Sequence, residues 1–161
     1  METHNSLGQG DKDFLDKAQC FEMGQSCACA NLRQAARVVT QLYDESLRPS
    51  GLRGTQFGLL MATKALGPVT LTKLAKSTMM DRTTLARNLR PLEKKELIRI
   101  EPGKDLRMRE ITMTDQGLEA LTEALPFWEK AQAHVVKSLG EERVNNLLEH
   151  LAAVVALIRK G

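Results

Sequence analysis

The residues whose types and spacing most clearly suggest chemistry lie between Arg82 and Arg109. This segment holds nine Lys or Arg residues against four Asp or Glu residues, a net charge of +5, which leaves −2 for the rest of a chain whose total is +3. Guanidinium and ammonium groups bind phosphate oxygens. A basic segment within an otherwise slightly acidic chain is therefore typical of a surface that binds a polyanion.

A helix is predicted to present these charges on one face. Asp81 is a suitable N-cap for a helix over residues 82–97, because its carboxylate can accept hydrogen bonds from free N–H groups of the first turn. At about 100° per residue, Leu85, Leu89 and Leu92 form one apolar stripe that would face the core. The opposite face carries hydroxyl and cationic side chains, namely Thr83, Arg87, Arg90 and Lys94. The charge is therefore directed away from the core.

The outward face of this helix has the chemistry needed to bind DNA. An α-helix fits the major groove, where Arg donates two hydrogen bonds to guanine and Thr meets polar base edges or the thymine methyl group. We expect Thr83, Thr84 and Arg87, in the first turns, to contact base edges. Arg90 and Lys94 lie further along and are expected to contact phosphates, which position the helix without specifying a sequence.

The preceding sequence predicts the helices that would position this one. Apolar residues at intervals of three and four predict helices over residues 27–48 and 55–66, and Thr70 is a suitable cap for a short helix ending near Ser77. In the second of these helices, Phe57, Leu60 and Met61 are expected to point inward. Only a few residues separate the short helix from the basic one, and this spacing is typical of a helix-turn-helix.

Two strands are predicted to follow the basic helix. Residues 97–101 and 108–113 alternate in polarity, and the intervening sequence PGKDLR contains turn residues, so a β-hairpin is expected. This hairpin would be the wing of a winged helix-turn-helix. Its basic residues are expected to reach phosphates or the adjacent minor groove, and they are Lys104, Arg107 and Arg109.

Two further helices are predicted from Asp115 onward, separated by Gly140. Their broad apolar stripes need a surface to cover them, and a second copy of the chain is the economical partner, with packing on the same subunit as the alternative. A homodimer is therefore expected.

The predicted fold is mainly α-helical. It has an N-terminal arm at 1–26, with at most a short helix around residues 13–20, and a first dimerisation helix at 27–50. The winged helix-turn-helix follows at 51–113, and C-terminal dimerisation helices occupy 114–161.

With these motifs in place, the sequence resembles the MarR family of bacterial winged-helix transcription regulators. The resemblance is carried by DRTTLARNLRPLEKKELI, by Asp105 and Arg107 in KDLRMREI, and by TMTDQG. It implies an obligate dimer in which the first and last two helices interlock, an Asp-x-Arg wing that contacts DNA, and a small effector bound between the reading and dimerisation parts. We therefore expect a repressor that binds a pseudo-palindromic operator and is released by a signal at the dimerisation region.

Two residues depart from a simple pattern at the end of the basic helix. Glu96 stands where the family generally has glycine, so the closure of the helix before the wing is expected to differ in this chain. Pro91 lies inside the helix, removes one backbone donor and predicts a kink.

The three cysteines, Cys20, Cys27 and Cys29, lie near the N-terminus and leave three alternatives open. Their sulfur atoms suit a thiophilic ion such as Cu(I), Zn(II), Hg(II) or trivalent arsenic. For this, Cys27 and Cys29 must precede the helix proper, since residues two apart in a helix diverge by about 200°. Thiols near the positive end of a helix are also readily oxidised, within or between subunits. The third alternative is that they are structural at the dimer interface and the effector is a small organic, for example phenolic, molecule.

Other classes of protein fit the sequence less well. It has no Gly-rich phosphate loop, no HExxH motif and no recognisable Ser or Cys nucleophile with His and an acid, so an enzyme is not expected. A protein-binding winged helix without DNA affinity is the alternative from another class. No apolar run reaches the roughly 18–20 residues that cross a bilayer, and the polar start lacks the features of a signal peptide, so we expect no membrane partner and a cytoplasmic location.

Overall fold

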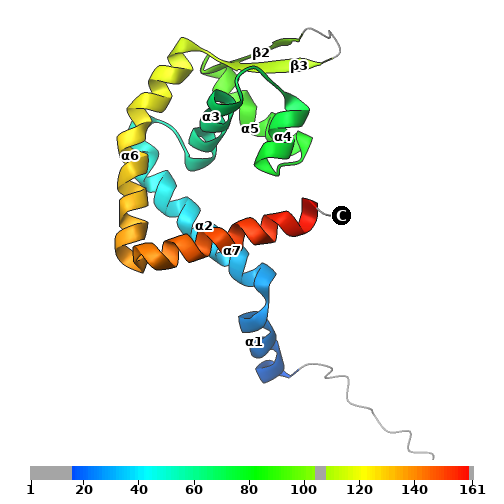
Figure 1. Cartoon of the computed structure of the whole chain (residues 1–161), viewed down its shortest axis with the longest axis vertical. Coiled ribbons are helices and arrows are strands. Elements are labelled where there is room, and N and C mark those ends of the chain that lie inside the picture. The colour runs from blue at the N-terminus through cyan, green and yellow to red at the C-terminus, as the bar shows by residue number, and fades with distance from the viewer. Residues whose placement is uncertain (1–15, 104–107, 160–161) are drawn as a thin grey trace, which may run out of the picture. The chain divides into compact units, whose positions relative to one another are not determined.

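The computed structural model describes residues 16–103 and 108–159 (Figure 1). Its contacts divide the described chain into two compact units, one up to Val39 and the other from Thr40 onward. The helix α2, Ala28–Leu47, belongs partly to each. Within the ranges that are described, no helix combines the length and apolar character needed to cross a membrane.

The first unit contains α1, Lys17–Ser26, and the start of α2. Asp16 caps α1, because its carboxylate accepts a hydrogen bond from the Gln19 N–H at 2.7 Å while the Gln19 side chain accepts one from the Asp16 N–H at 3.1 Å. The expected short helix around residues 13–20 is therefore placed too early along the chain: the observed helix begins after this cap and continues to Ser26. Residues 13–15 lie outside the described residues.

The second unit contains a winged helix-turn-helix followed by two long helices. After the end of α2, its elements are η1 (Arg48–Ser50), α3 (Gly54–Leu66), β1 (Val69–Thr70), α4 (Leu71–Thr78), α5 (Arg82–Lys94), β2 (Ile98–Pro102), β3 (Arg109–Met113), α6 (Asp115–Leu139) and α7 (Glu141–Arg159). The predicted hairpin is present, and β1 adds a third strand in the order β1-β3-β2, with every pairing antiparallel. The sequence does not predict β1, because two residues are too short for an alternating pattern.

The hydrophobic core of the second unit lies beneath α5 and the sheet. Leu85, Leu89 and Leu92 are fully buried there, as the helical periodicity predicts, together with Ile98 and Ile111 from the strands. Burying an aliphatic side chain of this size contributes about 1.5–3 kcal/mol. Since three such side chains lie on one face of α5, the core determines which face of the helix remains outside.

The inward face of α3 differs from its prediction at one position. Phe57 and Leu60 are buried, but Met61 is 43% exposed, and Leu59 is buried in its place. α3 contacts α4, α5, β3 and α6. Because these neighbours cover a wide arc of the helix, Leu59 on the side away from Met61 is also enclosed.

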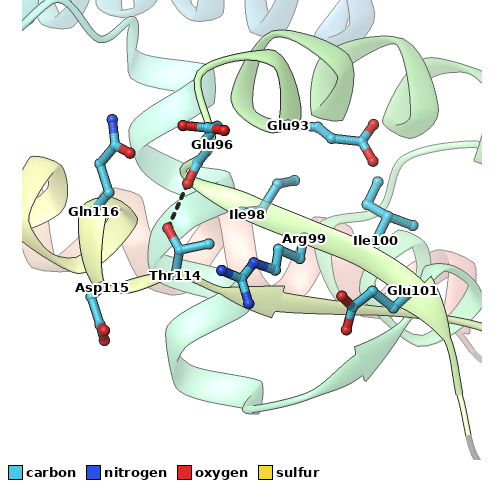
Figure 2. Close-up of a pocket in the computed structure, with 9 residues that line it drawn as sticks. All are labelled: Glu93, Glu96, Ile98, Arg99, Ile100, Glu101, Thr114, Asp115 and Gln116. Atoms are coloured by element: carbon cyan, nitrogen blue, oxygen red, sulfur yellow. Dashed lines mark hydrogen bonds between the residues drawn. The ribbon is translucent and has the colours of Figure 1, made fainter.

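The end of α5 closes in a standard way despite Glu96. The Leu97 N–H donates to the Leu92 carbonyl and the Glu96 N–H to the Glu93 carbonyl, both at 2.9 Å, which is the Schellman pattern. Glu96 adopts the left-handed conformation, with φ of 57°, that this motif requires. Figure 2 shows the hydroxyl of Thr114 donating to the Glu96 carbonyl, at 2.6 Å. The expectation of a different closure is therefore wrong, since Glu96 takes the conformation in which glycine is usual. α5 itself continues through Pro91.

Glu96→Gly is expected to stabilise the protein. A non-glycine residue at positive φ carries strain of about 1–3 kcal/mol, and the greater unfolded-state freedom of glycine offsets part of it, so the expected net gain is about 0.5–1 kcal/mol. The measurement is the urea midpoint at fixed protein concentration with an unchanged denaturant slope. Glu96→Ala is the matched control, because it removes the carboxylate and keeps the strain. Equal gains for both variants would assign the effect to charge and contradict this prediction.

The start of α6 lies unusually close to the end of α5. A Cβ atom at Gly117 would lie 2.0 Å from the Leu97 carbonyl oxygen, so only glycine fits at this position of the helix. Thr114 caps α6 by accepting a hydrogen bond from the Gly117 N–H at 2.9 Å, and its own N–H donates to the Leu97 carbonyl at 3.2 Å. These contacts fasten α6 to the base of the wing.

Candidate nucleic-acid interface

A tight turn between α4 and α5 determines where the basic helix α5 begins. α4 ends at Thr78 and is capped by Met79, whose φ is 54°, and the Met80 N–H donates to the Ala75 carbonyl at 3.0 Å. Asp81 then caps α5 by accepting a hydrogen bond from the Thr84 N–H at 2.8 Å. This is the compact helix-turn-helix connection that the sequence predicts.

The outer face of α5 forms a shallow basic hollow. Its volume is about 410 Å³, and its lining residues are Arg82, Thr83, Ala86, Arg87 and Arg90. Residues three and four apart are neighbours on a helix surface, and the small Ala86 leaves space among its longer neighbours. Thr83, Arg87 and Arg90 are all exposed, as the helical periodicity predicts for the face opposite the leucines. The structure thus gathers three predicted contacts on the face opposite the buried leucines.

Arg82 lines this hollow but is absent from the predicted contacts. On the helical wheel it lies about 60° from Leu85, at the edge of the apolar stripe, so periodicity alone does not assign it to the outer face. In the structure it is exposed, and its guanidinium donates to the Thr72 hydroxyl of α4 at 2.7 Å. This hydrogen bond joins the two helices of the helix-turn-helix.

Thr84 is placed differently from Thr83, although both are predicted to contact bases. Thr83 is exposed, whereas Thr84 is half-buried and its hydroxyl donates to the Asp81 carboxylate at 2.6 Å. The hydrogen bonds from the Thr84 hydroxyl and backbone N–H lower the pKa of Asp81 below its usual range. Asp81 is therefore ionised at neutral pH and holds the Thr84 hydroxyl.

The remaining predicted contacts lie outside the hollow or outside the described residues. Lys94 is exposed at the end of α5 but does not line the hollow. Arg109 is exposed at the start of β3, with a guanidinium nitrogen 3.5 Å from the Ile100 carbonyl oxygen, too long for a strong hydrogen bond. The wing-tip predictions Lys104, Asp105 and Arg107 fall on residues that the structure does not describe.

A second hollow near the end of α5 has the opposite charge. It occupies about 450 Å³ between α5, β2 and the start of α6, and Figure 2 shows its acidic side chains, which are Glu93, Glu96, Glu101 and Asp115, with Arg99 as the basic residue among them. Carboxylates repel a phosphate backbone. The surface suited to a polyanion is therefore the outer face of α5 and not this hollow.

The cysteines lie where α1 meets α2. Cys27 has an extended backbone between the two helices, Cys20 lies in α1 and Cys29 in the first turn of α2. All three are exposed in the single chain. Cys27, but not Cys29, thus precedes the helix proper. Over the described ranges, no three His, Cys, Asp or Glu side chains are grouped so that they could hold a metal ion.

The fold and the basic face of α5 define a winged helix-turn-helix protein of the DNA-binding class. A protein-family model, described as the MarR family, matches residues 50–108. The M. tuberculosis transcriptional regulator MosR, solved in complex with DNA, is 38% identical over 83% of this chain and 99% of its own, with a TM-score of 0.73. The chain belongs to the MarR family of transcriptional regulators. This agrees with the expectation that it is not an enzyme.

More distant relatives share the fold. A variant of E. coli MarR complexed with operator DNA is 20% identical, with a TM-score of 0.73 over 87% of this chain and 99% of its own. The Bacillus subtilis (strain 168) protein YwoH, described as an uncharacterized HTH-type transcriptional regulator, is 25% identical over 86 residues, or 53% of this chain. The match spans 63% of the length of YwoH.

Proposed function

We propose that this protein is a repressor that binds a pseudo-palindromic operator as a homodimer, with half-sites about one helical turn apart. The observation that carries the proposal is the outer face of α5, where Thr83, Arg87 and Arg90 surround a hollow opposite the buried leucine stripe. MosR in complex with DNA, and the protein CouR, described as a transcriptional repressor bound to a DNA duplex, support it. A repressor of this kind is expected to act in the cytoplasm.

Exposed apolar side chains on α7 support the homodimer. Among the described side chains of α7, Val144 is buried in the single chain, whereas five large apolar side chains are exposed, namely Leu147, Leu148, Val154, Val155 and Leu157. These exposed side chains favour a second copy of the chain as the partner over packing within the same subunit. A second copy would bury it, and would present two recognition helices to successive major grooves.

The junction of α1 and α2 is the part of the chain we assign to the signal. The Asn31 side-chain amide donates to the Gln25 and Cys27 carbonyls at 3.0 and 2.9 Å. This side chain of α2 thereby links the end of α1 to the start of α2. Cys27 and Cys29 lie at this junction and are exposed. Oxidation of these thiols, or binding of a soft metalloid, would act directly on the start of α2.

The other end of α2 is fastened to the DNA-reading part. The Gly54 N–H of α3 donates to the Asp44 carboxylate at 2.7 Å, and the Lys95 ammonium donates to the Gly51 carbonyl at 2.9 Å. Leu47, the last residue of α2, is fully buried in the core. A change in α2 would therefore alter the spacing of the two recognition helices, provided the signal favours one of two states over the other.

Fully reduced protein is expected to bind labelled DNA from upstream of its own gene tightly, with log K falling by about 0.9 per phosphate contact for each tenfold rise in salt. Adding a mild thiol oxidant, or in a parallel titration arsenite, is expected to weaken binding at least tenfold, because the junction at Cys27 is modified. Fluorescence anisotropy measures both effects. Cys27→Ser and Cys29→Ser are expected to retain binding under challenge.

The same titration separates the alternatives. Loss of DNA binding with arsenite alone would favour a metalloid signal. Loss of DNA binding with the oxidant alone would favour a redox signal. Binding that ignores both reagents would assign the cysteines a structural role and leave an organic, for example phenolic, effector as the signal. Weak DNA binding without steep salt dependence would favour a protein-binding winged helix. It would contradict the proposal that the protein binds an operator.

A further inference from the structure

Asp81 does more than cap the recognition helix. One of its carboxylate oxygens accepts the Thr84 N–H at 2.8 Å, and the other accepts the Thr84 hydroxyl at 2.6 Å. An N-cap needs only the first of these hydrogen bonds. The second fixes the orientation of a hydroxyl group in the turn of α5 that is expected to enter the major groove.

The charge of Asp81 determines whether the Thr84 hydroxyl can donate a hydrogen bond to DNA or only accept one. An ionised carboxylate only accepts hydrogen bonds, so the single hydroxyl proton of Thr84 must point toward Asp81. The Thr84 oxygen can then offer DNA only its remaining lone pairs. An adenine or cytosine presents an amino donor to such an oxygen in the major groove, whereas a guanine or thymine presents a carbonyl acceptor, and two acceptors without a proton between them repel.

We propose that Asp81 is a specificity-determining residue, which makes Thr84 select an amino base, adenine or cytosine, over a keto base, guanine or thymine, at one position of each half-site. The inference rests on the proposed function, because it requires α5 to read the major groove. Asp81 is a positioning residue here and acts through the Thr84 oxygen.

Asp81→Asn tests the inference without removing the cap, since Asn and Asp are equally good N-caps. The Thr84 N–H still needs an acceptor, so the Asn oxygen is expected to face it and the Asn amide to face the Thr84 hydroxyl. The amide donates, and the hydroxyl proton is released toward the DNA. Thr84 then becomes a donor that suits a keto base.

The measurement is the affinity of wild type and Asp81→Asn for operators carrying each of the four bases at each half-site position, by anisotropy. At one position we expect the amino-to-keto affinity ratio to fall about five- to tenfold in Asp81→Asn, the equivalent of one hydrogen bond. Removing a negative charge also raises affinity for all DNA, but this uniform effect cancels in the ratio.

Thr84→Val provides the matched control, because it keeps the side-chain shape and removes the hydroxyl. In the Thr84→Val background, Asp81→Asn is expected to leave the ratio unchanged. This inference alone would be overturned if Asp81→Asn still changed the amino-to-keto affinity ratio in the Thr84→Val background. It would also be overturned if Asp81→Asn left that ratio unchanged while Arg87→Ala relaxed the sequence preference. Wild-type protein that binds all sequences equally would overturn the proposed function with it.

Discussion

Arg87→Ala is expected to weaken binding to the operator by roughly 5- to 150-fold and to relax its sequence preference, the effect of losing about 1–3 kcal/mol of base recognition. Arg87 is exposed, lines the basic hollow of α5 and lies beside the small Ala86, so its guanidinium is free to reach a base edge. Anisotropy titrations with the operator and with a scrambled duplex of equal length measure affinity and preference together.

Lys94→Ala is the matched control for this prediction. Lys94 is also exposed on α5 but lies outside the hollow, near the end of the helix. Its removal is expected to weaken binding to both duplexes equally and to reduce the salt slope by about 1, as for a phosphate contact. If Arg87→Ala leaves both affinity and preference unchanged, α5 is not the recognition helix.

Gly117→Ala is expected to destabilise the protein by about 3 kcal/mol, although alanine ordinarily favours a helix. The added Cβ would lie 2.0 Å from the Leu97 carbonyl oxygen and 3.1 Å from the Met113 side chain. Because the closest atom belongs to the backbone, α6 has to move away from the base of the wing. The Thr114 hydrogen bonds to Leu97 and Glu96 would weaken with that movement.

The urea midpoint of Gly117→Ala, compared with that of Gly58→Ala, isolates the steric effect. Gly58 lies in the interior of α3, is exposed, and a Cβ added there meets nothing within 4 Å. Gly58→Ala is therefore expected to stabilise the protein by about 0.5–1 kcal/mol. A Gly117→Ala protein as stable as wild type would show that α6 can move at no cost.

The basic helix α5 could be predicted in detail because its signals are local. Asp81 caps α5, and the spacing of Leu85, Leu89 and Leu92 follows the helical period, so the buried face and the opposite basic face are both encoded within a few turns. The β-hairpin could also be predicted from the sequence, since alternation and turn residues are short-range features.

Features that depend on neighbours in space could not be predicted. Whether Met61 or Leu59 of α3 is buried depends on how many elements surround that helix. β1 exists because two residues lie beside β3, which no pattern within two residues can indicate. Similarly, Arg82 lines the basic hollow and donates a hydrogen bond to Thr72 of α4, ten residues earlier, which helical periodicity does not indicate.

The amino-acid sequence by itself determined the family, the helix-turn-helix and the face of α5 that carries the charge, because periodicity and capping act between residues close along the chain. The tertiary structure decided how the side chains on that face are arranged and oriented: the hollow around Ala86, the direction of the Thr84 hydroxyl, and the attachment of α6 at Gly117. These depend on distances between atoms of different turns and elements, and such distances exist only after the chain has packed.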